Sequence, residues 1–90
     1  MLILIKYGTE NPAENWKLEM AAADDVIVLI QNGVFWAVTT EGKKALAGKK
    51  VYALKADLEA RGYAVQDYPV EAIDYSGLIE LLEQNEKTMS

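Results

Sequence analysis

The 90-residue chain predicts an α/β fold: three α/β/α layers around a mostly parallel sheet of four or five strands. The first indication is Val26–Ile30, five consecutive apolar residues that are mostly β-branched, a pattern typical of a strand buried on both faces. The second is a regular alternation of strand-like and helical segments in the order βαβαβαβα, which favours right-handed crossovers. The third is the length, which suits a single domain over residues 1–90.

The predicted elements follow from apolar runs and from their flanking turn and capping residues. The four strands are Met1–Lys6, Val26–Ile30, Val51–Leu54 and Val70–Tyr75. The first helix starts at Asn11 as cap with Pro12 in its first position and runs to about Ala22. Trp16 and Met20 fall on one helical face, opposite Glu14, and Trp16 is expected to be a core or interface anchor.

Three further helical segments complete the pattern. Gly33–Ala47 is predicted to be helical with a break near Thr39, with Asn32 as its cap. Lys55–Arg61 is a short helix that ends at Gly62 in the left-handed conformation, before a loop from Tyr63 to Pro69. The last helix is capped by Ser76, and Asn85–Ser90 is expected to be a frayed polar tail.

Composition excludes several kinds of chemistry. The chain has no Cys and no His, so thiolate nucleophiles, imidazole bases and Cys/His zinc sites are ruled out, and no cofactor or metal is expected. Its net charge of -5 disfavours direct nucleic-acid binding. The apolar run Leu2–Ile5 is too short for a signal peptide or a membrane span, so a cytoplasmic protein is expected.

The loops that follow the four strands should meet at one edge of a parallel sheet. One hypothesis is a strand-end pocket for a small ligand, built from the polar and glycine residues of these loops: Tyr7, Gly8, Lys55, Asp57, Asp74 and Tyr75. The alternative is ordinary turn and capping chemistry, which favours the same residue types.

A partner interface is the second hypothesis, and it concerns the segment after the central predicted strand: Gln31, Asn32, Gly33, Phe35 and Trp36. Two adjacent large aromatic residues after an Asn-Gly turn are typical of interface anchors. The alternative is that both aromatic rings complete the core of this small domain. The apolar fraction of 51% also favours a surface covered by a partner subunit.

Three motifs together resemble the DsrH/TusB family. They are Val-Ile-Val-Leu-Ile-Gln-Asn-Gly-Val at residues 26–34, Val-Tyr-Ala-Leu-Lys-Ala-Asp-Leu-Glu-Ala-Arg-Gly at 51–62, and Ile-Asp-Tyr-Ser at 73–76. The resemblance implies membership of the DsrE/DsrF/DsrH-like sulfur-relay superfamily, whose members serve in 2-thiolation of the tRNA wobble uridine or in intracellular sulfur oxidation. In the catalytic sister subunit of this superfamily the sulfur-carrying Cys follows the third strand, near the position of Leu54 here.

Because persulfide carriage needs a thiolate and the chain has no Cys, the resemblance implies a non-catalytic subunit and no catalytic residue in this chain. The implied partners are Cys-bearing sister subunits, DsrE/TusD-like and DsrF/TusC-like. The alternative is a stand-alone protein, a homodimer or larger homo-oligomer, that binds a small ligand or serves a structural role without sulfur transfer.

Overall fold

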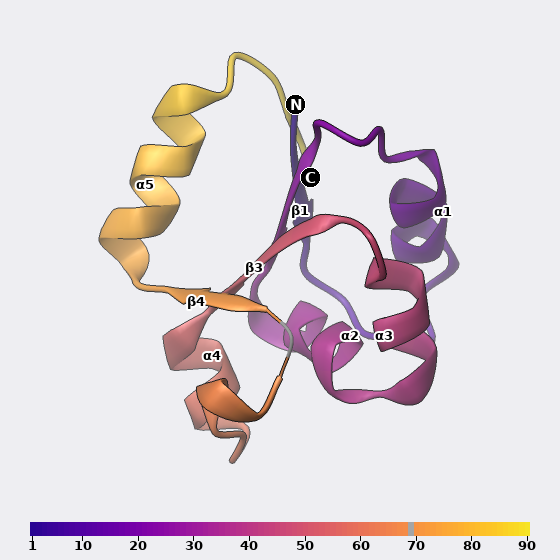
Figure 1. Cartoon of the computed structure of the whole chain (residues 1–90), viewed down its shortest axis with the longest axis vertical. Coiled ribbons are helices and arrows are strands. Elements are labelled where there is room, and N and C mark those ends of the chain that lie inside the picture. Colours follow the sequence, from indigo (N-terminus) through magenta and orange to yellow (C-terminus); the bar gives the residue numbers. More distant parts are fainter. Residues whose placement is uncertain (69) are drawn as a thin grey trace.

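The computed structural model describes residues 1–68 and 70–90; Pro69, the end of the loop expected after Gly62, lies outside them. Five strands form one sheet in the order β4-β3-β2-β1-β5, and every adjacent pair is parallel. Their bounds are β1 Leu2–Ile5, β2 Val26–Leu29, β3 Lys50–Leu54, β4 Glu71–Ile73 and β5 Thr88–Met89 (Figure 1). The predicted fold class, a parallel α/β fold, is confirmed.

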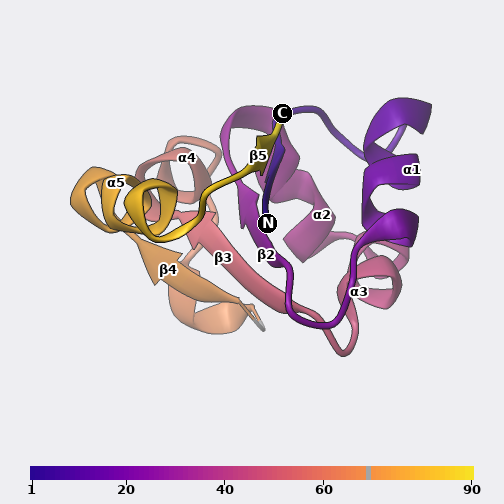
Figure 2. The ribbon, with the colours of Figure 1, turned by 90° about the horizontal axis from the view of Figure 1, so that it is seen from above.

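The helices cover the two faces of the sheet unequally. Their bounds are α1 Pro12–Met20, η1 Gln31–Val34, α2 Phe35–Val38, α3 Thr40–Leu46, α4 Lys55–Ala60, η2 Val65–Asp67 and α5 Tyr75–Gln84. Helices α1, α2 and α3 lie on one side of the sheet, and α5 lies on the other (Figure 2). This division follows from the strand order, because right-handed crossovers from β1 through β4 step in one direction and the crossover from β4 to β5 steps back.

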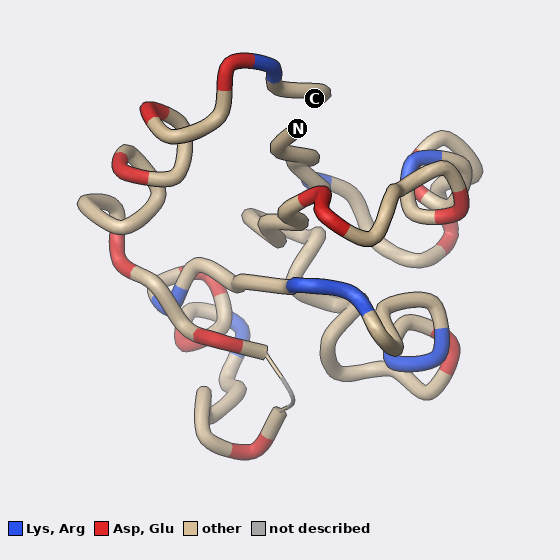
Figure 3. Tube along the Cα trace, turned by 45° about the horizontal axis from the view of Figure 1, so that its top comes forward, with Lys and Arg blue, Asp and Glu red and all other residues tan. Residues whose placement is uncertain are grey.

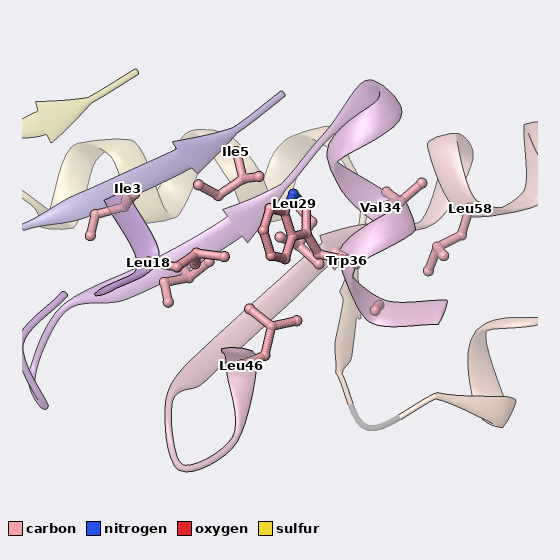
Figure 4. Packing of buried hydrophobic residues seen from close by; sticks show 11 residues of the cluster. Ile3, Ile5, Leu18, Leu29, Val34, Trp36, Leu46 and Leu58 are labelled. Atoms are coloured by element: carbon pink, nitrogen blue, oxygen red, sulfur yellow. The ribbon is translucent and has the colours of Figure 1, made fainter. Parts of the chain in front are cut away.

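The main core lies between the sheet and its first helical layer (Figure 4). Ile27 and Leu29 of β2 point into this cluster together with Trp36 and Leu58. Val28, between them, is also fully buried, although its side chain points to the opposite face of the strand. The central strand is therefore buried on both faces, as its unbroken apolar run predicts.

The carboxyl-terminal third departs from the sequence prediction at two points. The expected polar tail contains β5, whose residues Thr88 and Met89 pair with Leu2 and Ile3 of β1. The cap of α5 is Asp74 rather than Ser76, because the Asp74 carboxylate accepts a hydrogen bond from the Gly77 N–H at 2.8 Å.

The break in the second helical region occurs at Thr39, as expected.

Helix α1 turns the face with Trp16 and Met20 outward, so the core alternative for Trp16 is wrong and the interface alternative stays a prediction. Trp16 and Met20 are 56% and 62% exposed, while Glu14 and Leu18 face inward. The reason is local chemistry. The Glu14 carboxylate accepts hydrogen bonds from the N–H groups of Lys6 and Tyr7, so this polar residue faces inward, where the pattern of apolar residues predicts an apolar side chain.

Candidate functional site

The carboxyl edge of the sheet brings together the segment after β2 and helix α4. Gln31 donates its backbone N–H to Oδ2 of Asp57 at 2.7 Å. Gln31 also has a φ of 51°, a left-handed conformation that is uncommon for a residue with a Cβ. A non-glycine residue held in this region of φ and ψ needs support from its surroundings, and Asp57 supplies it here.

Arg61, at the carboxyl end of α4, links the same two segments. Its Nε and Nη2 both donate to Oδ1 of Asn32, at 3.0 and 2.8 Å, and its Nη1 donates to the carbonyl oxygen of Asp57 at 2.9 Å. An ion pair between Arg61 Nη1 and Asp57 Oδ1, at 3.8 Å, completes what we call the edge clamp: Gln31, Asn32, Asp57 and Arg61. The predicted helix-capping role of Asn32 is therefore wrong, since Ile30 is the cap residue of η1.

Arg61 is a residue that sequence reasoning missed at this site. In the sequence it resembles an ordinary basic residue in the last turn of a helix. Its spacing of four from Asp57 was the available signal, because an acid and a base at that spacing share a helix face. Nothing in the sequence placed either of them beside Asn32, which lies 29 residues away.

The predicted interface residues separate into surface and core. Gln31 and Asn32 are exposed, and Phe35 is half-buried. The Phe35 ring packs edge-to-face against the Tyr63 ring, with 6.2 Å between the ring centroids. Trp36 is only 2% exposed, and its indole Nε1 donates to the Tyr7 carbonyl oxygen at 3.0 Å. The alternative left open by the sequence, a core residue, therefore describes Trp36.

Gly33 is also buried, for a steric reason. A Cβ at this position would lie 1.9 Å from the carbonyl oxygen of Ile5. The Asn-Gly pair thus lets the chain turn from β2 directly against the end of β1. Of the five predicted interface residues, Gln31, Asn32 and Phe35 retain solvent exposure, and the interface itself stays a prediction.

The residues of the predicted strand-end pocket lie at this edge but have different local roles. Asp57 belongs to the edge clamp, and Asp74 caps α5. Tyr7 and Tyr75 are 53% and 61% exposed, and Lys55 is exposed at the start of α4. Gly8 is buried. The role of Asp74 is that of the turn-chemistry alternative, whereas Asp57 makes a long-range contact with Gln31, and a ligand at this edge stays a prediction.

Two carboxylates with altered pKa values lie elsewhere. Burial acts to raise the pKa of Glu14, but hydrogen bonds from Lys17, Tyr7 and Lys6 outweigh it and lower the pKa below its usual value. The pKa of Asp25 is lowered by the Ala22 N–H and by the amino terminus of Met1. Both carboxylates are occupied by backbone donors and by cations, an arrangement that holds loops in place.

Two features are absent from the part of the chain that the structure describes. In residues 1–68 and 70–90 there is no group of three or more His, Cys, Asp or Glu side chains placed to hold a metal ion. Over the same residues, no helix is long and apolar enough to cross a membrane. The edge clamp presents hydrogen-bonding groups on a fixed backbone beside the aromatic ring of Phe35, which is chemistry suited to binding.

These features define a small parallel α/β protein with a rigid loop at the carboxyl edge of its sheet. Residues 9–88 match the family model described as DsrH like protein, and the chain belongs to this sulfur-relay family. It is 34% identical to Protein TusB of Serratia proteamaculans over 77 residues and 35% identical to Protein TusB of Erwinia tasmaniensis over 79 residues, with 81% of each chain covered in both cases.

Solved structures agree with this assignment. A solution structure of protein Tm0979 from Thermotoga maritima has a TM-score of 0.73 and 50% identity, covering 97% of both chains. A second structure of that protein, named as a candidate sulfur transferase, has a TM-score of 0.70 and 49% identity, covering 98% of this chain and 97% of that one. The predicted family is confirmed.

Proposed function

We propose that this chain is a non-catalytic subunit of a sulfur-relay complex, and that it packs against Cys-bearing sister subunits of the DsrE/TusD-like and DsrF/TusC-like kinds. The observation that carries the proposal is that a chain of the DsrH-like family contains no Cys at all. A sulfur carrier must attack and hold sulfur through a thiolate, so the sulfur has to travel on another chain.

The surface we assign to the sister subunit is formed by Gln31, Asn32 and Phe35. The edge clamp supports this assignment because it fixes the backbone of the loop before any partner binds, which reduces the entropy lost on association. The surface also lies at the carboxyl edge of the sheet, where parallel α/β folds commonly bind ligands and partners.

Reconstitution with sister subunits tests the role. The chain is mixed with DsrE-like and DsrF-like subunits from the same genome, and the sister Cys is loaded with ³⁵S persulfide by a cysteine desulfurase. We expect the three chains to co-elute, this chain to stay unlabelled, and transfer from the sister to its acceptor to slow at least tenfold when this chain is left out. Co-elution without any effect on transfer would contradict the relay role.

A matched pair of substitutions tests the surface. Gln31→Arg adds charge and bulk at the edge while leaving the backbone N–H that Asp57 accepts. Gln84→Arg makes the same change at an exposed position at the far end of α5. We expect Gln31→Arg alone to weaken binding of the sister subunit, by at least tenfold in Kd. If both variants weaken binding of the sister subunit equally, the surface assignment is wrong, but the subunit role is not contradicted.

A further inference from the structure

A cavity of about 160 Å³ lies where α2, α3 and the turn into β3 meet. We call it the lysine corner, and it is lined by Ala37, Lys43, Leu46, Ala47, Gly48 and Lys49. Its inner wall is apolar, because Ala37 and Leu46 belong to the main core, and its outer wall carries two lysines. An apolar space of about 150 Å³ can hold a group as large as benzene.

The cavity exists because two residues with little or no side chain follow each other at the end of α3. Ala47 is the cap residue of the helix, and Gly48 continues the chain with a φ of 76°. A Cβ added to Gly48 would meet no atom within 4 Å, so the space beside this residue is open. A small apolar group can therefore enter the lysine corner without displacing a core side chain.

Positive charge is concentrated around this opening. Residues 43–50 contain no acid and four lysines, in a protein whose net charge is -5: Lys43, Lys44, Lys49 and Lys50. Figure 3 shows them as blue segments in α3 and where the chain enters β3. Among residues 1–68 and 70–90, none of the four forms an ion pair with a carboxylate, whereas Lys17 pairs with Glu14 and Arg61 with Asp57.

Stabilisation of α3 accounts for only part of this charge. Lys43 and Lys44 lie in the last turn of the helix, where cations interact favourably with the helix dipole. Lys49 and Lys50 lie beyond that turn, where the interaction fades. Lys49 is half-buried beside the cavity, and a half-buried ammonium group without a carboxylate partner among the described residues favours an external anion.

Lys43 is held at the cavity by an aromatic ring. Its Nζ lies 5.6 Å from the centroid of the Tyr68 ring, which is a cation–π contact. The Tyr68 ring packs edge-to-face against the Tyr63 ring, with 5.7 Å between the centroids. These contacts order the ammonium group but leave its charge unneutralised, so less side-chain entropy is lost when an anion binds.

We propose that the lysine corner binds a small anion with an apolar body, of the class of aromatic or branched aliphatic carboxylates. The apolar body fills the space beside Ala37 and Leu46, and the carboxylate pairs with Lys43 and Lys49. The net charge of -5 disfavours a phosphate backbone as the ligand. The site lies at the amino end of β3, away from the edge clamp, so it goes beyond the sulfur-relay role and requires no sister subunit.

Three probes separate the two halves of this recognition: benzoate, acetate with the charge alone, and benzyl alcohol with the ring alone. A bound ring shifts the NMR signals of the Ala37 and Leu46 methyl groups. We expect benzoate to shift both saturably with a Kd of about 1 mM, and the other two probes to bind at least about fivefold more weakly. Unshifted methyl signals at about 20 mM benzoate, or benzyl alcohol binding as tightly as benzoate, overturns the proposal.

Single lysine substitutions test the charged half. Lys43→Gln and Lys49→Gln should each raise the Kd for benzoate about fivefold. Lys87→Gln removes the same charge at an exposed position outside the cavity lining and should leave the Kd unchanged. Circular dichroism checks that each variant is folded. Equal weakening by all three variants would indicate diffuse attraction and overturn the site, as would lysine-dependent retention of a uridine oligonucleotide without any response to benzoate.

Discussion

The indole Nε1 of Trp36 donates a hydrogen bond to the carbonyl oxygen of Tyr7 at 3.0 Å. This bond joins α2 to the loop after β1, two segments separated by 29 residues, and it satisfies the only polar atom of a side chain that is 2% exposed. The second tryptophan, Trp16, is 56% exposed on α1. The two residues therefore form a matched pair for testing the core.

Replacing Trp36 with Phe should lower the free energy of unfolding by about 1–3 kcal/mol, because the change removes a buried hydrogen bond and part of a core side chain. Trp16→Phe should change it by less than about 0.5 kcal/mol, as is usual for surface positions. Urea unfolding monitored by circular dichroism gives both values. Equal effects of the two substitutions would contradict the placement of Trp36 in the core.

Glu14→Gln should destabilise the protein at neutral pH by about 1–3 kcal/mol, the range for losing hydrogen bonds to a buried charged group. The Glu14 carboxylate accepts from the N–H groups of Lys6 and Tyr7 at 2.7 and 3.1 Å and pairs with Lys17 Nζ at 2.6 Å. Unfolding curves of the variant, wild type and Glu59→Gln, a change at an exposed carboxylate of α4, measure the effect.

The pH dependence of this difference has a defined sign. Because the pKa of Glu14 is lowered in the folded protein, its contribution is complete above the ordinary value of 4.5 and is lost as the pH falls through the lowered pKa. The stability gap between wild type and Glu14→Gln should therefore be constant above about pH 5.5 and close in stronger acid. A gap that widens on acidification would be inconsistent with a lowered pKa.

Gly33→Ala should lower the free energy of unfolding by at least about 3 kcal/mol, the upper end of the range for overpacking. The new Cβ would lie 1.9 Å from the Ile5 carbonyl oxygen. Gly48 is the control: its φ of 76° disfavours a Cβ, but no atom lies within 4 Å of the position. Gly48→Ala should cost only about 1–2 kcal/mol of backbone strain. Thermal unfolding compares the two, and an equal loss would show that the Ile5 backbone moves aside for the new Cβ, since Gly33 itself has no positive φ.

The sheet was predictable because its determinants are local. The apolar run Val26–Ile30 predicts a strand buried on both faces. Gly62 follows α4 with a positive φ of 84°, as expected. Strand β5 was not predictable in the same way. Thr88–Met89 has no apolar run of its own, and it becomes a strand because β1 offers it an open edge.

The site was predictable in position but not in its internal contacts. The loop after the central strand was identified from its Gln-Asn-Gly turn and its aromatic residues. Two details depended on long-range packing: Trp36 is buried by contacts across 29 residues, and Arg61 reaches Asn32 across the same separation. The rotation of α1 depended on Glu14 serving as a buried acceptor, an arrangement that hydrophobic periodicity does not reveal.

The last prediction concerns the edge clamp. Arg61→Lys keeps the positive charge but loses the planar fork that donates twice to Asn32 and once to Asp57. We expect the loop after β2 to open more often, so that the amide of Gln31 exchanges with solvent about tenfold faster while the global unfolding energy falls by about 1 kcal/mol or less. Hydrogen exchange followed by NMR measures this amide directly.

Lys50→Gln removes a lysine charge far from the edge clamp and is the control, with no expected change at Gln31. Asp57→Asn separates the two halves of the clamp, because Asp57 Oδ2 accepts the Gln31 N–H while Arg61 holds Asn32. If the Gln31 amide exchanges at the wild-type rate in Arg61→Lys but faster in Asp57→Asn, then Asp57 alone holds the left-handed backbone. Arg61 would then serve only to place Asn32 on the surface that we assign to the sister subunit.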